Sequence, residues 1–157
     1  MILCTECYVQ QGDKTLMMYR NKKDADINAG KWVGLGGKFE AGESPEQCLL
    51  REVQEEAGIT LTSYRLRGMV TFMTTNSADD QMLIFVYTAD GFTGTPNMTA
   101  CSEGSLQWVN TDAIGGLNLW AGDRLFWEWM QQDKGLFSAR FIYDGEDLVQ
   151  HDVSFYL

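Results

Sequence analysis

Runs of apolar residues alternate along the chain with polar segments, at lengths typical of strands and helices. The first apolar run, Ile2 to Val9, predicts a strand, and Thr15 to Arg20 predicts its partner across a turn at Gln11-Gly12-Asp13. The polar segment from residue 21 to residue 30 predicts a loop. Later runs rich in β-branched and aromatic residues predict further strands at 66–74, 82–88 and 106–109.

A helix beginning near residue 45 carries local signals at both of its ends. Ser44 is a favoured N-cap, Pro45 suits the first helical position, and Gln47 completes a capping box. Gly58 directly follows Ala57 and is a typical C-terminal stop, because glycine adopts the left-handed conformation without strain. These signals predict a helix that ends at Ala57.

Residues 120–132 predict a second, amphipathic helix, because their apolar positions recur at helical spacing. The chain ends in a predicted hairpin with strands at 137–143 and 148–157 and a turn at Asp144-Gly145. Strands and helices are mixed without the regular alternation of a doubly wound sheet. The pattern therefore predicts an α+β or α-β-α layered arrangement, in a single domain that covers residues 1–157.

Composition narrows the classes of partner. The chain has 157 residues, of which 45% are hydrophobic and 22% charged, as in folded globular proteins. No apolar run approaches the roughly 20 residues of a membrane-spanning helix, and no signal peptide is visible. A formal net charge of −10 disfavours nucleic-acid and membrane partners. We expect a cytoplasmic protein, monomeric or homodimeric, that binds a phosphorylated small molecule through divalent cations.

The cysteines and the histidine offer little chemistry. Cys4 and Cys7 form one Cys-x-x-Cys without a second pair, and positions three apart on a strand face opposite sides of a sheet. We expect all four cysteines, which also include Cys48 and Cys101, to be buried, reduced thiols. His151 is the only histidine, and no Gly-x-Ser-x-Gly motif accompanies it, so a serine-hydrolase arrangement is not expected.

Three glutamates of the first predicted helix share one face. Relative to Glu52, Glu55 and Glu56 lie at about −60° and about +40° around the helix axis. Carboxylates crowded in this way repel each other, so they do not stabilise a helix by themselves. A solvated acidic face is one interpretation. The other is a Mg²⁺ or Mn²⁺ site, because hard cations prefer carboxylate oxygens.

A wider pattern favours the metal site. The chain satisfies the motif Gly-x5-Glu-x7-Arg-Glu-U-x-Glu-Glu-x-Gly-U, in which U is an aliphatic residue. Its specified positions are filled by Gly37, Glu43, Arg51, Glu52, Val53, Glu55, Glu56, Gly58 and Ile59. Because every position of this motif is filled, the chain resembles the Nudix hydrolase family.

The resemblance implies an α/β/α sandwich with a mixed central sheet and the hydrolysis of a phosphoanhydride bond. The implied ligands of Mg²⁺ or Mn²⁺ are the carboxylates of Glu52, Glu55 and Glu56 and a backbone carbonyl of Gly36 or Gly37. One of the glutamates would orient or deprotonate the attacking water, and the motif leaves open which one. Arg51 and Glu43 would brace the catalytic helix through charge-assisted hydrogen bonds.

The resemblance extends to the MutT-like branch that hydrolyses oxidised purine nucleoside triphosphates. The matching segments are Ala29-Gly30-Lys31-Trp32, Gly34-Leu35-Gly36-Gly37-Lys38, Gly94-Thr95-Pro96, Trp120 with Asp123, and the hairpin around Phe141, Gly145, Asp147 and Val149. They imply a substrate such as 8-oxo-dGTP, which would be cleaved to the monophosphate and pyrophosphate.

The same resemblance implies roles in substrate binding, and each has a structural alternative. Lys23 and Lys38 match lysines near the phosphates, although many exposed lysines are only solvated. Glu103 matches a further acidic position at the metal site. Trp120 matches an aromatic residue that stacks on the base, or it is ordinary core. Asp123 would hydrogen-bond the purine edge, or it would stabilise the start of a helix.

Two departures concern base recognition. Val33, which belongs to the predicted substrate-binding set, stands where this branch has a base-reading asparagine, and Gly122 stands where it has the first of two aspartates. The residues that read the base are therefore altered, whereas the phosphate-cleaving set is complete. Another Nudix substrate is one alternative interpretation. A non-catalytic nucleotide-binding domain is the other, and the intact motif opposes it.

Overall fold

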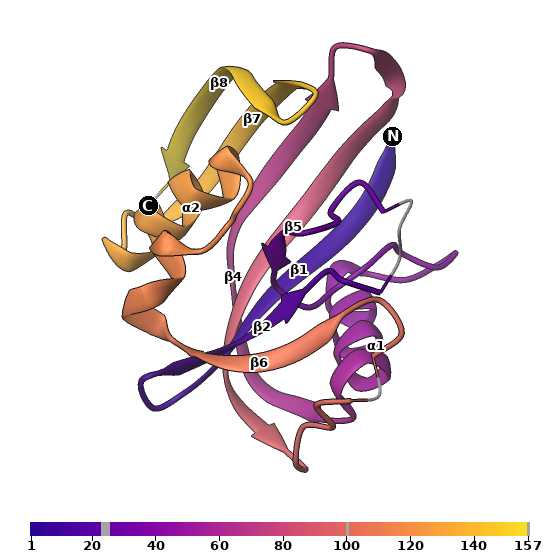
Figure 1. Cartoon of the computed structure of the whole chain (residues 1–157), viewed down its shortest axis with the longest axis vertical. Coiled ribbons are helices and arrows are strands. Elements are labelled where there is room, and N and C mark those ends of the chain that lie inside the picture. The colour runs from indigo at the N-terminus through magenta and orange to yellow at the C-terminus, as the bar shows by residue number, and fades with distance from the viewer. Residues whose placement is uncertain (23–25, 100, 157) are drawn as a thin grey trace.

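The computed structural model describes residues 1–22, 26–99 and 101–156, and over these residues it forms one eight-stranded sheet with helices packed beside it (Figure 1). The strands are β1 (Ile2–Gln11), β2 (Lys14–Tyr19), β3 (Trp32–Val33), β4 (Thr60–Thr74), β5 (Ser77–Thr93), β6 (Ser105–Asn110), β7 (Leu136–Asp144) and β8 (Asp147–Tyr156). The helices are α1 (Pro45–Ala57), the 3-10 helix η1 (Thr111–Gly116) and α2 (Ala121–Gln131).

The sheet is mixed, as the resemblance implied. Its strand order is β3-β2-β1-β5-β4-β7-β8, and β6 pairs with β2 beside this path. Strand β1 runs parallel to β5 and β4 runs parallel to β7, whereas the other neighbouring strands are antiparallel. Strand β1 therefore lies inside the sheet, between β2 and β5, and its residues Thr5 and Cys7 to Val9 are buried.

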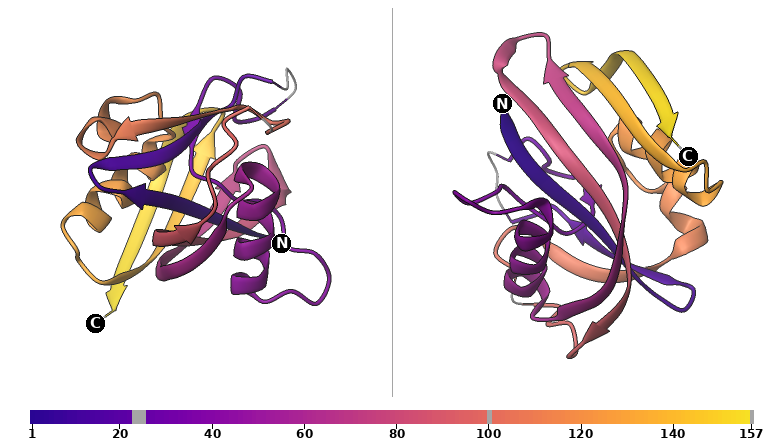
Figure 2. Two further views of the ribbon diagram at one scale, coloured as in Figure 1. Left: turned by 90° about the horizontal axis from the view of Figure 1, so that it is seen from below. Right: turned by 180° about the vertical axis from the view of Figure 1, so that it is seen from behind.

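Helices α1 and α2 lie on opposite faces of the sheet (Figure 2). Alternation along β1 divides its side chains between the two faces. Cys7 packs into an apolar cluster with Leu49 and Val53 of α1, whereas Tyr8 packs into a second cluster with Phe126 of α2. The predicted α/β/α arrangement is therefore confirmed.

The predicted ends of α1 are also confirmed. The Ser44 side chain accepts a hydrogen bond from the Gln47 backbone N–H at 3.2 Å, and the Gln47 side chain accepts one from the Ser44 N–H at 2.9 Å. Gly58 has φ 70° and donates its N–H to the Gln54 carbonyl at 2.9 Å. Because capping residues lie next to the helix in sequence, these boundaries were predictable from local pattern alone.

Strands β4 and β5 are longer than the predicted 66–74 and 82–88. The two form a long antiparallel hairpin with irregular register at four places, and their ends carry exposed polar residues. Backbone pairing continues there without an apolar side-chain pattern, so hydrophobic periodicity alone underestimates the strands. The six-residue helix η1 was not predicted, because Gly115 and Gly116 favour a loop.

The four cysteines are free thiols. Cys7, Cys48 and Cys101 are buried as predicted, whereas Cys4 is only partly buried, so that part of the prediction was wrong. Cys4 points to the face opposite Cys7 and lines a cleft, which leaves its side chain accessible. None of the helices among the described residues is long and apolar enough to cross a membrane.

Candidate active site

The acidic face of α1 is graded from buried to exposed. Glu56 is buried and retains only 7% of its accessible surface. The Glu52 side chain is 16% exposed, and that of Glu55 is 57% exposed. Helical angle places the three on one face, but contact with the loop between β3 and α1 decides which of them is enclosed.

Glu56 connects α1 to this loop. Its Oε1 accepts the Gly36 backbone N–H at 2.6 Å, while its Oε2 is buried and has no hydrogen-bond partner. Burial, together with the negative charges of nearby Glu103 and Glu52, raises the pKa of Glu56 to about 8. A buried carboxyl oxygen without a partner is costly unless a ligand satisfies it.

The loop needs glycine where it passes α1. A Cβ at Gly37 would lie 2.6 Å from the Glu52 carboxyl carbon, and a Cβ at Gly36 would lie 2.0 Å from the Thr5 carbonyl oxygen. Gly36 also has φ 149°, which other residues rarely adopt. The two glycines therefore bring backbone groups against the Glu52 and Glu56 carboxyls without side chains between them.

Arg51 holds the acidic face in place. Its guanidinium donates to the Glu43 carboxylate at 2.7 and 2.9 Å, and to the Lys38 carbonyl at 3.0 Å. It also donates to Glu52 at 2.8 Å and to Glu55 at 3.3 Å. The hydrogen bonds from Arg51 lower the pKa of Glu43 to about 2. The bracing role predicted for Arg51 and Glu43 matches this geometry.

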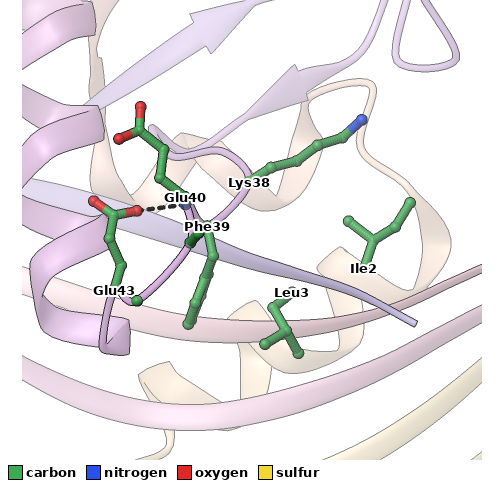
Figure 3. A pocket seen from close by; sticks show the side chains of 8 residues that line it. Ile2, Leu3, Lys38, Phe39, Glu40 and Glu43 are labelled. Carbon is green, nitrogen blue, oxygen red and sulfur yellow. Dashed lines mark hydrogen bonds between the residues drawn. The ribbon is translucent and has the colours of Figure 1, made fainter.

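The loop before α1 encloses a shallow hollow of about 390 Å³ (Figure 3). Figure 3 shows the Glu43 carboxylate accepting a hydrogen bond from the Glu40 backbone N–H, at 2.6 Å. Lys38 extends along the other side of this hollow. Glu43 is thus bonded on one side to its own loop and on the other to Arg51, and this joins the loop to α1.

Glu103 approaches the site from the segment before β6. Its carboxylate accepts from Arg20 at 3.1 Å, and Arg20 also pairs with Asp26 at 2.6 Å. Glu103 and Glu52 line the same cleft, and the negative charge of Glu103 contributes to the raised pKa of both Glu56 and Glu52. The structure therefore brings Glu103 to the acidic face, as the resemblance implied.

In residues 1–22, 26–99 and 101–156, no three acidic, histidine or cysteine side chains are grouped closely enough to hold a metal ion. Glu52 and Glu56 face the glycine loop, whereas Glu55 is turned outward to Arg51. The donor set still fits a hard cation, because the unpaired Oε2 of Glu56 is a carboxylate oxygen beside other carboxylates. The assignment of metal ligands stays a prediction.

A cleft of about 900 Å³ runs from this acidic face along the sheet. Near the acidic face its lining includes Gly36, Gly37, Lys38, Glu52 and Glu103. Away from it the lining includes Val33, Phe72, Trp120, Asp123 and Tyr143. The structure thus brings nearly all of the predicted substrate-binding residues to one cleft. Lys23 lies outside the described residues.

Trp120 forms part of the aromatic end of the cleft. Its indole N–H donates to the Asn28 side chain at 2.8 Å. Its ring meets Tyr143 and Phe72 edge-on, with centroids 5.1 and 6.2 Å away. Lys31 places its ammonium 5.2 Å from the same ring. Trp120 is 6% exposed, so its orientation is set by surrounding contacts before any ligand arrives.

Sequence reasoning did not assign several residues of the cleft to the site, and Glu6, Asn28 and Phe72 are three of them. One of them had a visible signal, because Glu6 interrupts an otherwise apolar segment of an interior strand. The other two had none, since an asparagine in a loop and a phenylalanine in a strand are ordinary at such positions.

The chain matches the NUDIX domain over residues 4–130 and belongs to the Nudix hydrolase family. Its fold is MutT-like: a crystal structure of the mutator MutT protein from Bacillus halodurans superposes with a TM-score of 0.86, at 26% identity, over 98% of this chain and 97% of that one. The predictions of family and fold are confirmed.

Two relatives resemble the chain over most of its length. An uncharacterised Nudix hydrolase of Bacillus subtilis (strain 168) is 33% identical over 144 residues, which are 90% of this chain and 87% of that protein. The oxidised purine nucleoside triphosphate hydrolase of Danio rerio is 33% identical over 127 residues, which are 81% of this chain and 79% of that protein.

Proposed function

We propose that this Nudix hydrolase uses Mg²⁺ or Mn²⁺ to cleave an oxidised purine nucleoside triphosphate, such as 8-oxo-dGTP, to the monophosphate and pyrophosphate. Two observations carry the proposal: the buried Oε2 of Glu56 has no hydrogen-bond partner, and Gly36, to which the same carboxyl is bonded, lines a cleft with Glu52 and Glu103 at one end and aromatic residues at the other. The oxidised purine hydrolase of Danio rerio supports the choice of substrate.

The proposed site divides the substrate between the two ends of the cleft. Glu52 and Glu56, with Glu103 and the Gly36 or Gly37 carbonyl, would hold the divalent cation. Its chemistry there would be to neutralise phosphate charge and to lower the pKa of water. Lys38 would face the phosphates, and Trp120 would stack on the base at the aromatic end.

The reaction adds one water across the anhydride between the α and β phosphorus atoms. The water oxygen bonds to one phosphorus, the bridging P–O bond breaks, and pyrophosphate leaves. A glutamate of α1 would accept the proton from the water. Arg51 would keep the Glu52 carboxylate oriented through the bond described above, so that only a small reorganisation is needed.

A substrate panel tests this proposal. With Mg²⁺, we expect kcat/KM for 8-oxo-dGTP to exceed that for dGTP, 2-hydroxy-dATP, dihydroneopterin triphosphate and ADP-ribose. Released pyrophosphate and monophosphate identify the bond that is cleaved. Preference for ADP-ribose or dihydroneopterin triphosphate would overturn the substrate while leaving the family assignment intact. Absence of turnover with every nucleotide would overturn the catalytic proposal itself.

A further inference from the structure

Glu6 lies on the wall of the same cleft, on the interior strand β1. It shares the face of β1 with Tyr8, two residues along, so it points to the side of the sheet that α2 covers. Asp123, in the first turn of α2, lines the cleft as well. Two carboxyl groups from different elements therefore border the aromatic end of the cleft.

The Glu6 side chain is held by two donors that share one of its oxygens. The Gly34 backbone N–H and the Tyr8 hydroxyl each donate to Oε1 at 3.0 Å. Tyr8 is itself fixed against α2, with ring centroids 5.1 Å from Trp127 and 6.0 Å from Phe126. No described residue hydrogen-bonds to the other oxygen, Oε2, which leaves it available to a molecule in the cleft.

The backbone around Glu6 leaves room for this arrangement. A Cβ at Gly34 would lie 3.0 Å from the Glu6 Cγ and 2.7 Å from the Cys7 carbonyl oxygen. A larger residue at position 34 would therefore push against the Glu6 side chain and the strand that carries it. Both the donor to Oε1 and the space for the side chain come from the same glycine.

The two carboxyls differ in what stabilises their charge. Burial raises the pKa of Glu6, and its bonds from Gly34 and Tyr8 offset only part of this rise. Burial also raises the pKa of Asp123, the charge of Glu6 raises it further, and no described residue hydrogen-bonds to its side chain. Two close carboxyls in a poorly solvated site do not both ionise readily. The hydrogen bonds favour Glu6 as the ionised acceptor of the pair.

We propose that Glu6 is a specificity-determining residue, whose Oε2 accepts an N–H donor from the edge of the purine base. The inference rests on the proposed function, because it takes the aromatic end of the cleft as the site of the base. It explains how a chain with Val33 and Gly122 at its altered positions still presents a polar group to the base. A buried acceptor in this place favours bases that present an N–H and penalises those that leave it unpaired.

The isosteric variant Glu6→Gln gives a directional test. Gly34 and Tyr8 require an acceptor, so the amide oxygen stays in the position of Oε1 and the amide NH₂ replaces Oε2. The atom facing the ligand then changes from acceptor to donor while size and fold are kept. Glu128→Gln is the matched control, because it makes the same chemical change at an exposed position of α2 outside the lining of the cleft.

We expect Glu6→Gln to lower kcat/KM for 8-oxo-dGTP by about 10- to 100-fold, mostly through KM. Binding of 8-oxo-dGMP, measured by calorimetry, weakens by a similar factor, whereas binding of pyrophosphate with Mg²⁺ is unchanged. Glu128→Gln changes each quantity by less than about twofold. Tyr8→Phe, which removes one donor to Oε1 and leaves Oε2 in place, gives a smaller loss of the same kind.

Two results would overturn the inference. One is a Glu6→Gln enzyme that melts like wild type and binds 8-oxo-dGMP equally well. The other is an equal loss of nucleotide and pyrophosphate binding, which would place the role of Glu6 at the phosphate end. Both are distinct from failure of the proposed function, in which the wild-type protein itself turns over no nucleotide.

Discussion

Glu56 and Gly36 are joined by a hydrogen bond of 2.6 Å that ties the C-terminal part of the sequence motif to the loop twenty residues before it. The bond uses one carboxyl oxygen and leaves the other buried without a partner. The carboxyl is thus positioned by the fold at the expense of stability, because desolvation disfavours its charge. Such an arrangement is expected where the missing partner is a ligand.

The first prediction concerns turnover. We expect Glu56→Gln to reduce kcat by about 10²- to 10⁴-fold, because the amide cannot accept a proton or bind a cation as a carboxylate does. The amide oxygen can still accept the Gly36 N–H, so the fold is kept. Steady-state kinetics and circular dichroism check both parts. Glu128→Gln, at an exposed position of α2, is the control with the same chemical change. Activity close to wild type in Glu56→Gln would contradict the assigned role.

The second prediction concerns stability and pH in the metal-free protein. The pKa of Glu56 is raised to about 8 in the folded state, against about 4.3 in an unfolded chain. Between these values the folded state binds more protons, so the free energy of unfolding falls as pH rises from about 5 to 8. The Glu56→Gln variant should lack this decrease in the free energy of unfolding, which is on the order of a few kcal/mol. Urea unfolding in EDTA at pH 5.5 and 8.5 measures it, and an identical pH dependence in both proteins would contradict it.

The third prediction concerns metal binding. At pH 7 Glu56 in the metal-free protein is largely protonated, so a cation that binds its carboxylate must displace a proton. Affinity for Mg²⁺ or Mn²⁺ should therefore increase as pH rises toward 8 and change little above it. Calorimetry in two buffers of different ionisation enthalpy counts the protons released. Release of close to one proton at pH 7 is expected, and Glu56→Gln should abolish it.

The fourth prediction concerns the close approach of the loop to α1. In Gly37→Ala the new methyl group would lie 2.6 Å from the Glu52 carboxyl carbon, so that carboxylate must move. We expect kcat/KM to fall by about 10²-fold, since displacement of a catalytic group by about 1 Å has effects of this size. The control is Gly115→Ala, whose Cβ meets nothing within 4 Å. Equal activity of the two variants would show that the Glu52 position is unimportant.

The fifth prediction concerns the ion pair between Arg51 and Glu43. The folded-state pKa of Glu43 is lowered to about 2 by Arg51, so its contribution to stability is present above about pH 4.3 and is lost as pH falls toward 2. Glu43→Gln should therefore lower the melting temperature at pH 7 and have a much smaller effect near pH 2.5. Thermal melting at the two pH values measures this. A larger effect in acid than at neutral pH would be inconsistent with the ion pair.

The phosphate end of the site was predictable from sequence, because its parts lie close together along the chain. The signals at Ser44 and Gly58 set the ends of α1, and helical geometry then placed Glu52, Glu55 and Glu56 on one face. Which of them is buried depends on the loop that packs against α1. That contact lies outside the helix, so Glu55 was grouped with the others although it is exposed.

The base end was less predictable for the same reason. Its lining comes from β1, β3, β4, β7, α2 and the loop that contains Asn28, and these elements meet only through the pairing of the sheet and the packing of α2 and the loop. Glu6 could have been singled out as a charge in an apolar interior strand. Its two hydrogen-bond donors are Gly34, in a loop, and Tyr8, on the same strand. The local sequence pattern does not indicate that both donate to one oxygen.

The bond from Arg51 to the Lys38 carbonyl, together with the ion pair to Glu43, joins two parts of one short stretch of chain, and this stretch carries all the residues of the proposed cleavage site except Glu103. The wall that faces the base is supplied by strands and a helix outside that stretch. Under the proposed division of the cleft, changes in β1 or α2 would alter the preferred nucleotide without changing the residues that cleave it. One scaffold could in this way support related enzymes that act on different nucleotides.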